Sequence, residues 1–114
     1  MMNTERVTLP DGIELDCLVA GDKGRPLMLF LHGFPEAAFV WEELLAHFSL
    51  PAQGGYCCVA PNLRGYAGSS SPTDVSAYRA KELVKDVAAL AHHFSPDSPM
   101  ACLVAHDWGG AVAW

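Results

Sequence analysis

Positive charge is scarce in this sequence of 114 residues. Seven lysines and arginines stand against thirteen aspartates and glutamates, so the formal net charge is −6. A surface of that sign repels phosphate backbones and anionic lipid headgroups. We therefore expect neither nucleic acid nor a membrane surface as a partner.

Long hydrophobic runs are also missing, although 51% of the residues are apolar. No run approaches the roughly 20 apolar residues that cross a bilayer. The opening residues, MMNTERVTLPDG, are too polar for the apolar segment of a signal peptide. The composition predicts a soluble, cytoplasmic protein, and the length suits one domain.

Cysteine is sparse and irregularly spaced. Cys17, Cys57, Cys58 and Cys102 lie in apolar, strand-like segments and form no CxxC pair. Zinc sites and disulfide frameworks use characteristic cysteine spacings, which are absent here. We predict four reduced cysteines in the core, no bound metal and no cofactor.

Apolar periodicity predicts an alternation of strands and helices. Residues 6–9 and 13–20 flank the turn signal PDG, which indicates an antiparallel hairpin. Residues 27–31, 56–60 and 100–105 are continuously apolar, as parallel strands buried on both faces are. Residues 39–48 and 80–94 carry apolar positions at helical spacing, and a third helix would follow the last strand.

The resulting order, β-β-β-α-β-α-β-α, predicts an antiparallel hairpin followed by parallel strands with flanking helices, an α/β fold. We expect strand 27–31 to pair with 56–60 on one side and with 100–105 on the other. The last strand would then lie at the edge of the sheet.

Three motifs follow the three predicted parallel strands. They are HGFPE at 32–36, PNLRGYAGSS at 61–70 and HDWGG at 106–110. Because ligands of open α/β sheets bind at the carboxyl ends of the strands, these motifs should gather at one edge. This edge is the predicted site.

Asp107 is the candidate nucleophile. Small residues two positions before and after it, Ala105 and Gly109, are typical of a nucleophile elbow, where the chain turns sharply from strand to helix. At a helix N-terminus its carboxylate would stay ionised and could attack saturated carbon, forming an alkyl-enzyme ester. We expect a positive φ at Asp107; the structural alternative is a simple helix N-cap.

Hydrolysis of that ester would turn its carbonyl oxygen into an oxyanion, which needs preorganised N–H donors. The backbone N–H groups of Phe34 and Trp108 are the expected pair. The neighbouring residues expected to support the site are His32, Gly33, Pro35, His106 and Gly109.

No histidine is placed to act as the base. Adjacent residues at a strand end point to opposite faces, so His106 should point away from Asp107, and we assign it a buried, hydrogen-bonded supporting role. His92 and His93 would close a helix, where they suit the negative end of its dipole. His47 lies near the end of the other helix.

The motifs HGFPE, APNLRGYAGSSSP and AHDWGG resemble, in order and spacing, HGFPE, APDLRGYGDSSAP and GHDWGG of the epoxide hydrolases, a branch of the α/β-hydrolase superfamily. The similarity extends over most of residues 27–114. It implies an α/β-hydrolase fold, epoxide opening by backside attack of Asp107, an oxyanion hole from Phe34 and Trp108, and a cis Phe34–Pro35 peptide. Asn62 stands where the family has Asp, an isosteric change that bears on the rigidity of its loop.

Members of that family are longer than this sequence. A helical cap supplies the tyrosines that protonate the epoxide oxygen, and a later segment supplies an acid and a histidine for the hydrolytic step. We therefore expect residues 1–114 to be the N-terminal part of an α/β-hydrolase domain that needs the rest of the hydrolase chain. Formation of a homo-oligomer is left open.

Two dehalogenase families share the Asp elbow. Haloacetate dehalogenases generally carry Arg after the nucleophile, where this chain has Trp108, and haloalkane dehalogenases usually have Asn in place of Phe34. Trp108 is, however, also the halide-binding residue of the haloalkane enzymes. The expected partner is thus a small apolar epoxide or halogenated substrate, and a non-catalytic interaction module is the third hypothesis.

Overall fold

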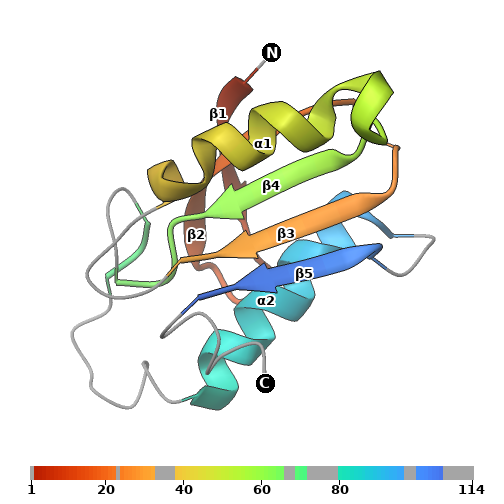
Figure 1. Ribbon diagram of the computed structural model, residues 1–114. Coiled ribbons are helices and arrows are strands. Elements are labelled where there is room, and N and C mark those ends of the chain that lie inside the picture. Colours follow the sequence, from red (N-terminus) through yellow and green to blue (C-terminus); the bar gives the residue numbers. More distant parts are fainter. Residues whose placement is uncertain are drawn as a thin grey trace.

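Five strands form one mixed sheet with a helix on each face (Figure 1). The computed structural model describes residues 2–22, 24–32, 38–65, 69–71, 80–96 and 100–106. The strands are β1 (Met2–Thr8), β2 (Glu14–Ala20), β3 (Leu27–Leu31), β4 (Cys57–Pro61) and β5 (Cys102–Ala105). The helices are α1 (Glu42–Ser49) and α2 (Ala80–Phe94), with 3₁₀ turns η1 (Ala38–Trp41) and η2 (Pro51–Gln53).

The hairpin β1–β2 is confirmed, and β1 is longer than its apolar pattern predicted. It begins at Met2, because the whole of β1 pairs antiparallel with β2, from Met2 opposite Ala20 to Thr8 opposite Glu14. Gly12, at φ 89°, closes the turn in a conformation that other residues rarely adopt.

The strand order is β1-β2-β4-β3-β5, so β3 lies between β4 and β5 and is parallel to both. This confirms the predicted neighbours of β3 and the edge position of β5. Alternate residues of β3 face opposite layers, with Leu29 in the cluster under α2 and Phe30 in the cluster under α1. Burial on both faces is confirmed for β3 and β4 and explains their unbroken apolar runs. The prediction is wrong for β5, whose residues are exposed or only partly buried.

Helix α2 has the predicted bounds, but the face that it buries is narrower than predicted. Leu83, Val87, Leu90 and Phe94 are buried against the sheet, whereas Val84 is 47% exposed.

The predicted apolar side of residues 39–48 is also only partly correct. Residues 38–41 form a 3₁₀ turn with three residues per turn, which breaks the helical spacing and leaves Val40 and Leu44 exposed.

The prediction of four core cysteines is wrong for Cys102. Cys17, Cys57 and Cys58 are buried and free, but Cys102 is free and exposed because it begins the edge strand β5.

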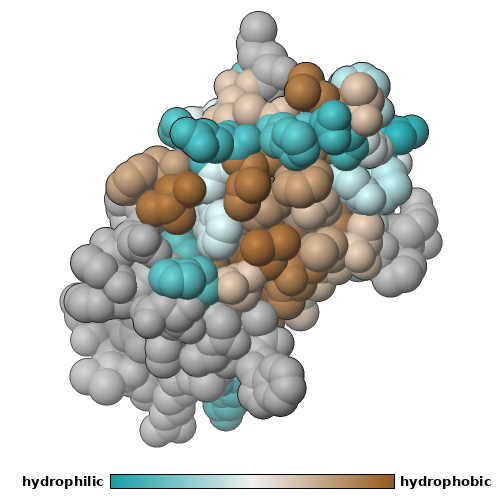
Figure 2. Space-filling view, viewed as in Figure 1, coloured by the Kyte–Doolittle hydropathy of each residue, from teal (hydrophilic) through white to brown (hydrophobic). Residues whose placement is uncertain are grey.

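Apolar side chains gather over the part of the sheet beside α1 (Figure 2). In the part of the chain that the structure describes, no helix is long and apolar enough to cross a membrane.

Candidate active site

The carboxyl ends of β3, β4 and β5 lie at the same edge of the sheet, where their arrows point in Figure 1. His32, Asn62 and His106 are the first residues beyond these strands. The backbone N–H of His106 donates to the carbonyl oxygen of Leu31 at 3.2 Å, which ties the ends of β5 and β3 together. The predicted gathering of the three motifs is therefore confirmed for His32, Asn62 and His106, the described residues that directly follow the strands.

His32 is fully buried at this edge. Its Nε2 accepts a hydrogen bond from the backbone N–H of Leu63 at 3.0 Å. A ring nitrogen that accepts a hydrogen bond carries no proton, so the imidazole is neutral with its proton on Nδ1. The lone pair is already engaged, which agrees with a supporting role for His32.

Asn62 joins three parts of the chain. Its Oδ1 accepts the backbone N–H of Ala38 at 2.7 Å, and its own N–H donates to the carbonyl oxygen of Asp16 at 2.7 Å. The Ser69 hydroxyl donates to the carbonyl oxygen of Asn62 at 2.5 Å. Asn62 is thus held by β2 and by Ser69 while its side chain holds the start of η1.

The segment after β4 is also fixed to β2. Ser69 Oγ accepts the N–H of Asp16 at 3.0 Å, and Ser70 Oγ accepts the N–H of Glu14 at 2.9 Å. The Ser70 N–H donates in turn to the carbonyl oxygen of Glu14 at 2.8 Å. These bonds take the place of strand pairing beyond the end of β4. Ser69 and Ser70, the last two residues of the motif PNLRGYAGSS, thus hold this segment against β2.

A buried ion pair joins the same segment to α2. The Arg64 guanidinium donates to both carboxylate oxygens of Asp86, at 2.8 and 2.7 Å, and lies 3.5 Å from an oxygen of Asp11 in the hairpin turn. The hydrogen bond that Arg64 donates to Asp86 is the largest of the effects that raise the pKa of Arg64. Burial raises the pKa of Asp86, and the contacts with Arg64 oppose that rise.

Sequence reasoning did not find the Arg64–Asp86 pair, although a signal was present. Asp86 lies three residues after Leu83 and four before Leu90, on the buried stripe of α2. A charged residue at such a position needs a partner. The partner's identity depends on which loop packs beside the helix, which periodicity does not show.

The buried role predicted for His106 is wrong, because this residue is exposed. It follows β5, which has a neighbouring strand on only one side among the described residues. His92 and His93 lie in the last turn of α2, and His47 in the last turn of α1, as predicted.

The remaining predicted site residues lie outside the described part of the chain: Gly33, Phe34, Pro35, Asp107, Trp108 and Gly109. The same holds for the predicted φ of Asp107, the cis peptide and the third helix. Among the described residues, no group of three or more His, Cys, Asp and Glu side chains could hold a metal ion.

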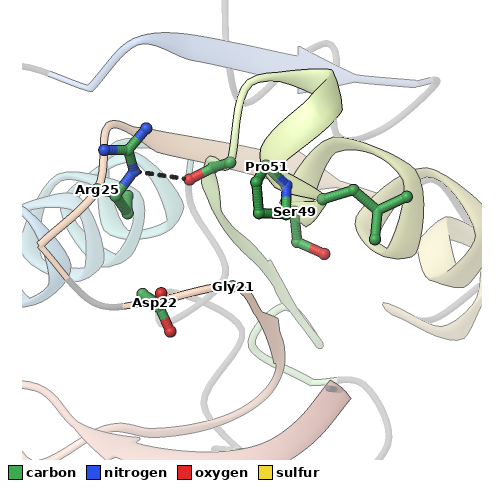
Figure 3. A pocket seen from close by; sticks show the side chains of 7 residues that line it. Gly21, Asp22, Arg25, Ser49 and Pro51 are labelled. Atoms are coloured by element: carbon green, nitrogen blue, oxygen red, sulfur yellow. Dashed lines mark hydrogen bonds between the residues drawn. The ribbon is translucent and has the colours of Figure 1, made fainter.

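A hollow of about 500 Å³ lies at the opposite end of the parallel strands, beside the loops that precede them (Figure 3). Gly21, Arg25 and Gly55 are among its lining residues, and they come from the loops before β3 and β4. Arg25 Nε donates to the carbonyl oxygen of Gly55 at 3.1 Å, which joins the two loops. The hollow is therefore remote from the carboxyl ends of the strands.

Comparison with known proteins identifies the family. Residues 26–114 match the family model described as alpha/beta hydrolase fold. The chain is 37% identical to epoxide hydrolase A of Mycobacterium tuberculosis over 111 residues, which cover 97% of this chain and 33% of that protein. It is 41% identical to epoxide hydrolase 3 of Xenopus tropicalis over 103 residues, which cover 90% of this chain and 26% of that protein.

Solved structures give the same result. The chain resembles the crystal structure of an epoxide hydrolase from Vigna radiata with a TM-score of 0.86 and 36% identity, covering 99% of this chain and 34% of the other. It also resembles an epoxide hydrolase from metagenomes of hot environments, with a TM-score of 0.86, 39% identity, and coverage of 100% and 36%. The chain spans between about a quarter and about a third of the length of these relatives.

Proposed function

The chain belongs to the alpha/beta hydrolase fold family, and from that membership we propose that it is the N-terminal part of an epoxide hydrolase with Asp107 as the nucleophile. The observation that carries the proposal is the joining of the β3 and β5 ends, through the hydrogen bond from His106 to Leu31. His32 directly follows Leu31, so the motifs HGFPE and HDWGG, which resemble those of the epoxide hydrolases, begin at His32 and His106 on neighbouring strands.

The first half-reaction forms the ester. The ionised carboxylate of Asp107 attacks one ring carbon from the side opposite the oxygen, a carbon–oxygen bond forms, and the ring carbon–oxygen bond breaks. The released alkoxide takes a proton from an acid, a role that the resemblance gives to cap tyrosines outside residues 1–114. No cofactor takes part, because neither the oxidation state nor the atom count requires one.

The second half-reaction releases the diol. Water, deprotonated by a base, attacks the carbonyl carbon of the Asp107 ester, and the carbonyl oxygen becomes an oxyanion that the N–H groups of Phe34 and Trp108 stabilise. Collapse of this intermediate breaks the ester bond, and the base returns the proton taken from water to the departing oxygen, which gives the diol. The Asp107 carboxyl then loses its proton, which restores the carboxylate and balances the proton that the acid gave in the first half-reaction. The neutral His32, whose Nε2 accepts the N–H of Leu63, holds the end of β3 in place and takes no proton in this scheme.

The test follows solvent oxygen. The natural protein, expressed from its own gene so that any further segment is included, is incubated with styrene oxide in H₂¹⁸O, and peptides are mapped by mass. We expect an ester on the peptide containing Asp107, and then ¹⁸O in that carboxylate, because water attacks the enzyme's carbonyl carbon. Direct attack of water on the epoxide would leave Asp107 unlabelled and refute the mechanism.

Two variants make the assignment specific. Asp107→Asn should form no ester, whereas Asp22→Asn, an exposed aspartate near the opposite edge, should behave as the natural protein does. A parallel incubation with a chloroalkane separates the epoxide hydrolase from a dehalogenase. Absence of any adduct with either compound would favour a non-catalytic module.

Residues 1–114 alone should form a stalled ester at most. His92 and His93 lie on α2, and the ring of His32 is engaged by Leu63, so a base for the second half-reaction is expected from another segment. Diol release well beyond one equivalent per isolated chain would show that a base lies within these residues.

A further inference from the structure

Two consecutive residues after β4 bind the two described residues that flank positions 33–37. His32, which precedes these positions, accepts the backbone N–H of Leu63 at 3.0 Å. Ala38, which follows them, donates its backbone N–H to Oδ1 of Asn62 at 2.7 Å. Because adjacent Cα atoms are only about 3.8 Å apart, both flanks are tied within the span of one dipeptide.

We propose that Asn62 is a positioning residue for ester hydrolysis, because its carboxamide oxygen holds the backbone of Ala38, four positions after Phe34. The inference rests on the proposed function, in which the Phe34 N–H stabilises the oxyanion. A displacement of such a donor by a fraction of an ångström weakens it, because its advantage lies in being preorganised.

Asn62 can serve as a fixed point because its own backbone is held on both sides. Its N–H donates to Asp16 in β2, and its carbonyl oxygen accepts the Ser69 hydroxyl. Ser69 Oγ accepts in addition the N–H of Asp16, so the three residues form a closed set of hydrogen bonds. A side chain anchored in this way transmits the position of the sheet to Ala38.

The contact with Ala38 uses only the oxygen of the carboxamide. Aspartate has an acceptor at the same place and should keep the bond, which explains how Asn can stand where the related family has Asp. Leucine has nearly the same shape and no acceptor, so it should remove the bond. A role of the Nδ2 donor toward substrate, by contrast, would be lost in both variants.

The experiment separates the two half-reactions in the natural protein with styrene oxide. Ester formation and ester decay are followed by quenched-flow intact mass for the wild type, Asn62→Leu and Asn62→Asp. We expect Asn62→Leu to slow ester decay by about tenfold or more, since loss of an oxyanion donor costs up to about 10²–10³ in rate. Ester formation should stay within about threefold, and Asn62→Asp should decay within about twofold of the wild type.

Val87→Ala is the control for general destabilisation, since Val87 is buried between α2 and the sheet. It should lower stability without changing the ratio of the two rates. If Asn62→Leu does not fold, Asn62→Ser, whose hydroxyl is one atom too short to reach Ala38, takes its place with the same expectation.

Three outcomes would overturn the inference: wild-type ester decay in Asn62→Leu, equal slowing in Val87→Ala, or slow decay in Asn62→Asp. In each of these the wild type still forms its ester on Asp107, so the proposed function survives. A wild type that forms no ester is a different result, because it removes the proposed function itself.

Discussion

The buried Arg64–Asp86 pair should behave as one unit in the stability of the fold. The side chains are only 5% and 3% exposed, and two hydrogen bonds of 2.8 and 2.7 Å join them. Removing one partner leaves a buried charge, which costs about 3–5 kcal/mol, whereas replacing both by apolar residues is often close to neutral. We expect losses of that size in Arg64→Met and in Asp86→Leu, and a loss of about 1 kcal/mol or less in the double variant.

The two single variants should differ in their dependence on pH. Burial raises the pKa of Asp86, and removal of Arg64 takes away the contacts that oppose this rise. A carboxyl whose folded pKa is raised destabilises the fold as the pH rises through the window above its ordinary value. Arg64→Met should therefore regain stability as the pH falls through that window, whereas in Asp86→Leu the guanidinium stays charged and the loss persists.

Urea unfolding, followed by far-UV circular dichroism at several pH values, measures these free energies. Arg6→Met is the matched control, because Arg6 and Glu14 are equally close, at 2.8 Å, but both are exposed. Exposed pairs contribute little, so this variant should unfold close to the wild type. Equal losses in the double variant and in the sum of the single variants would refute the coupling, and an Arg64→Met loss independent of pH would refute the role given to Asp86.

Three further outcomes are expected. Gly21→Ala should cost about 1–3 kcal/mol in urea unfolding, because a Cβ there would clash with the carbonyl oxygen of Tyr56. Gly12→Ala, at the same φ of 89° but in open space, should cost less, and equal losses would contradict the steric argument. A thiol reagent should titrate one cysteine of the native 114-residue chain, Cys102, and all four after denaturation; rapid native reaction of four would contradict the burial of the others. Burial raises the pKa of Cys17 from near 9 to about 12, so unfolding free energy should fall between those pH values as only the unfolded thiol ionises, and Cys17→Ala should flatten that fall.

Much of the architecture was predictable because local patterns carry it. The unbroken apolar run of β3 indicates burial on both faces. Alternate side chains of β3 do pack in the cluster under α2 and in the cluster under α1. Because the carboxyl ends of parallel strands lie at the same side of a sheet, the sequence also predicted that His32, Asn62 and His106 lie close together. The roles of Asp107, Trp108 and Phe34 remain predictions, since these residues lie outside the described part of the chain.

Errors arose where exposure depends on neighbours in space. Cys102 begins the apolar strand β5 and His106 begins the motif after it, yet both are exposed. Val84 has helical spacing with the core residues of α2 but lies 47% exposed. Periodicity specifies the direction of a side chain relative to its own element, and burial depends on what packs against that direction.

By itself the sequence determined the order of elements, the hairpin turn and the motifs at the strand ends, because spacing and turn chemistry act over a few residues. Only the tertiary structure decided that β4 lies between β2 and β3, and with it the partners of the segment after β4. Asn62 meets Ala38 across 24 positions and Arg64 meets Asp86 across 22. Such pairs form because the folded sheet and helix bring distant loops to one edge, and no local periodicity encodes that distance.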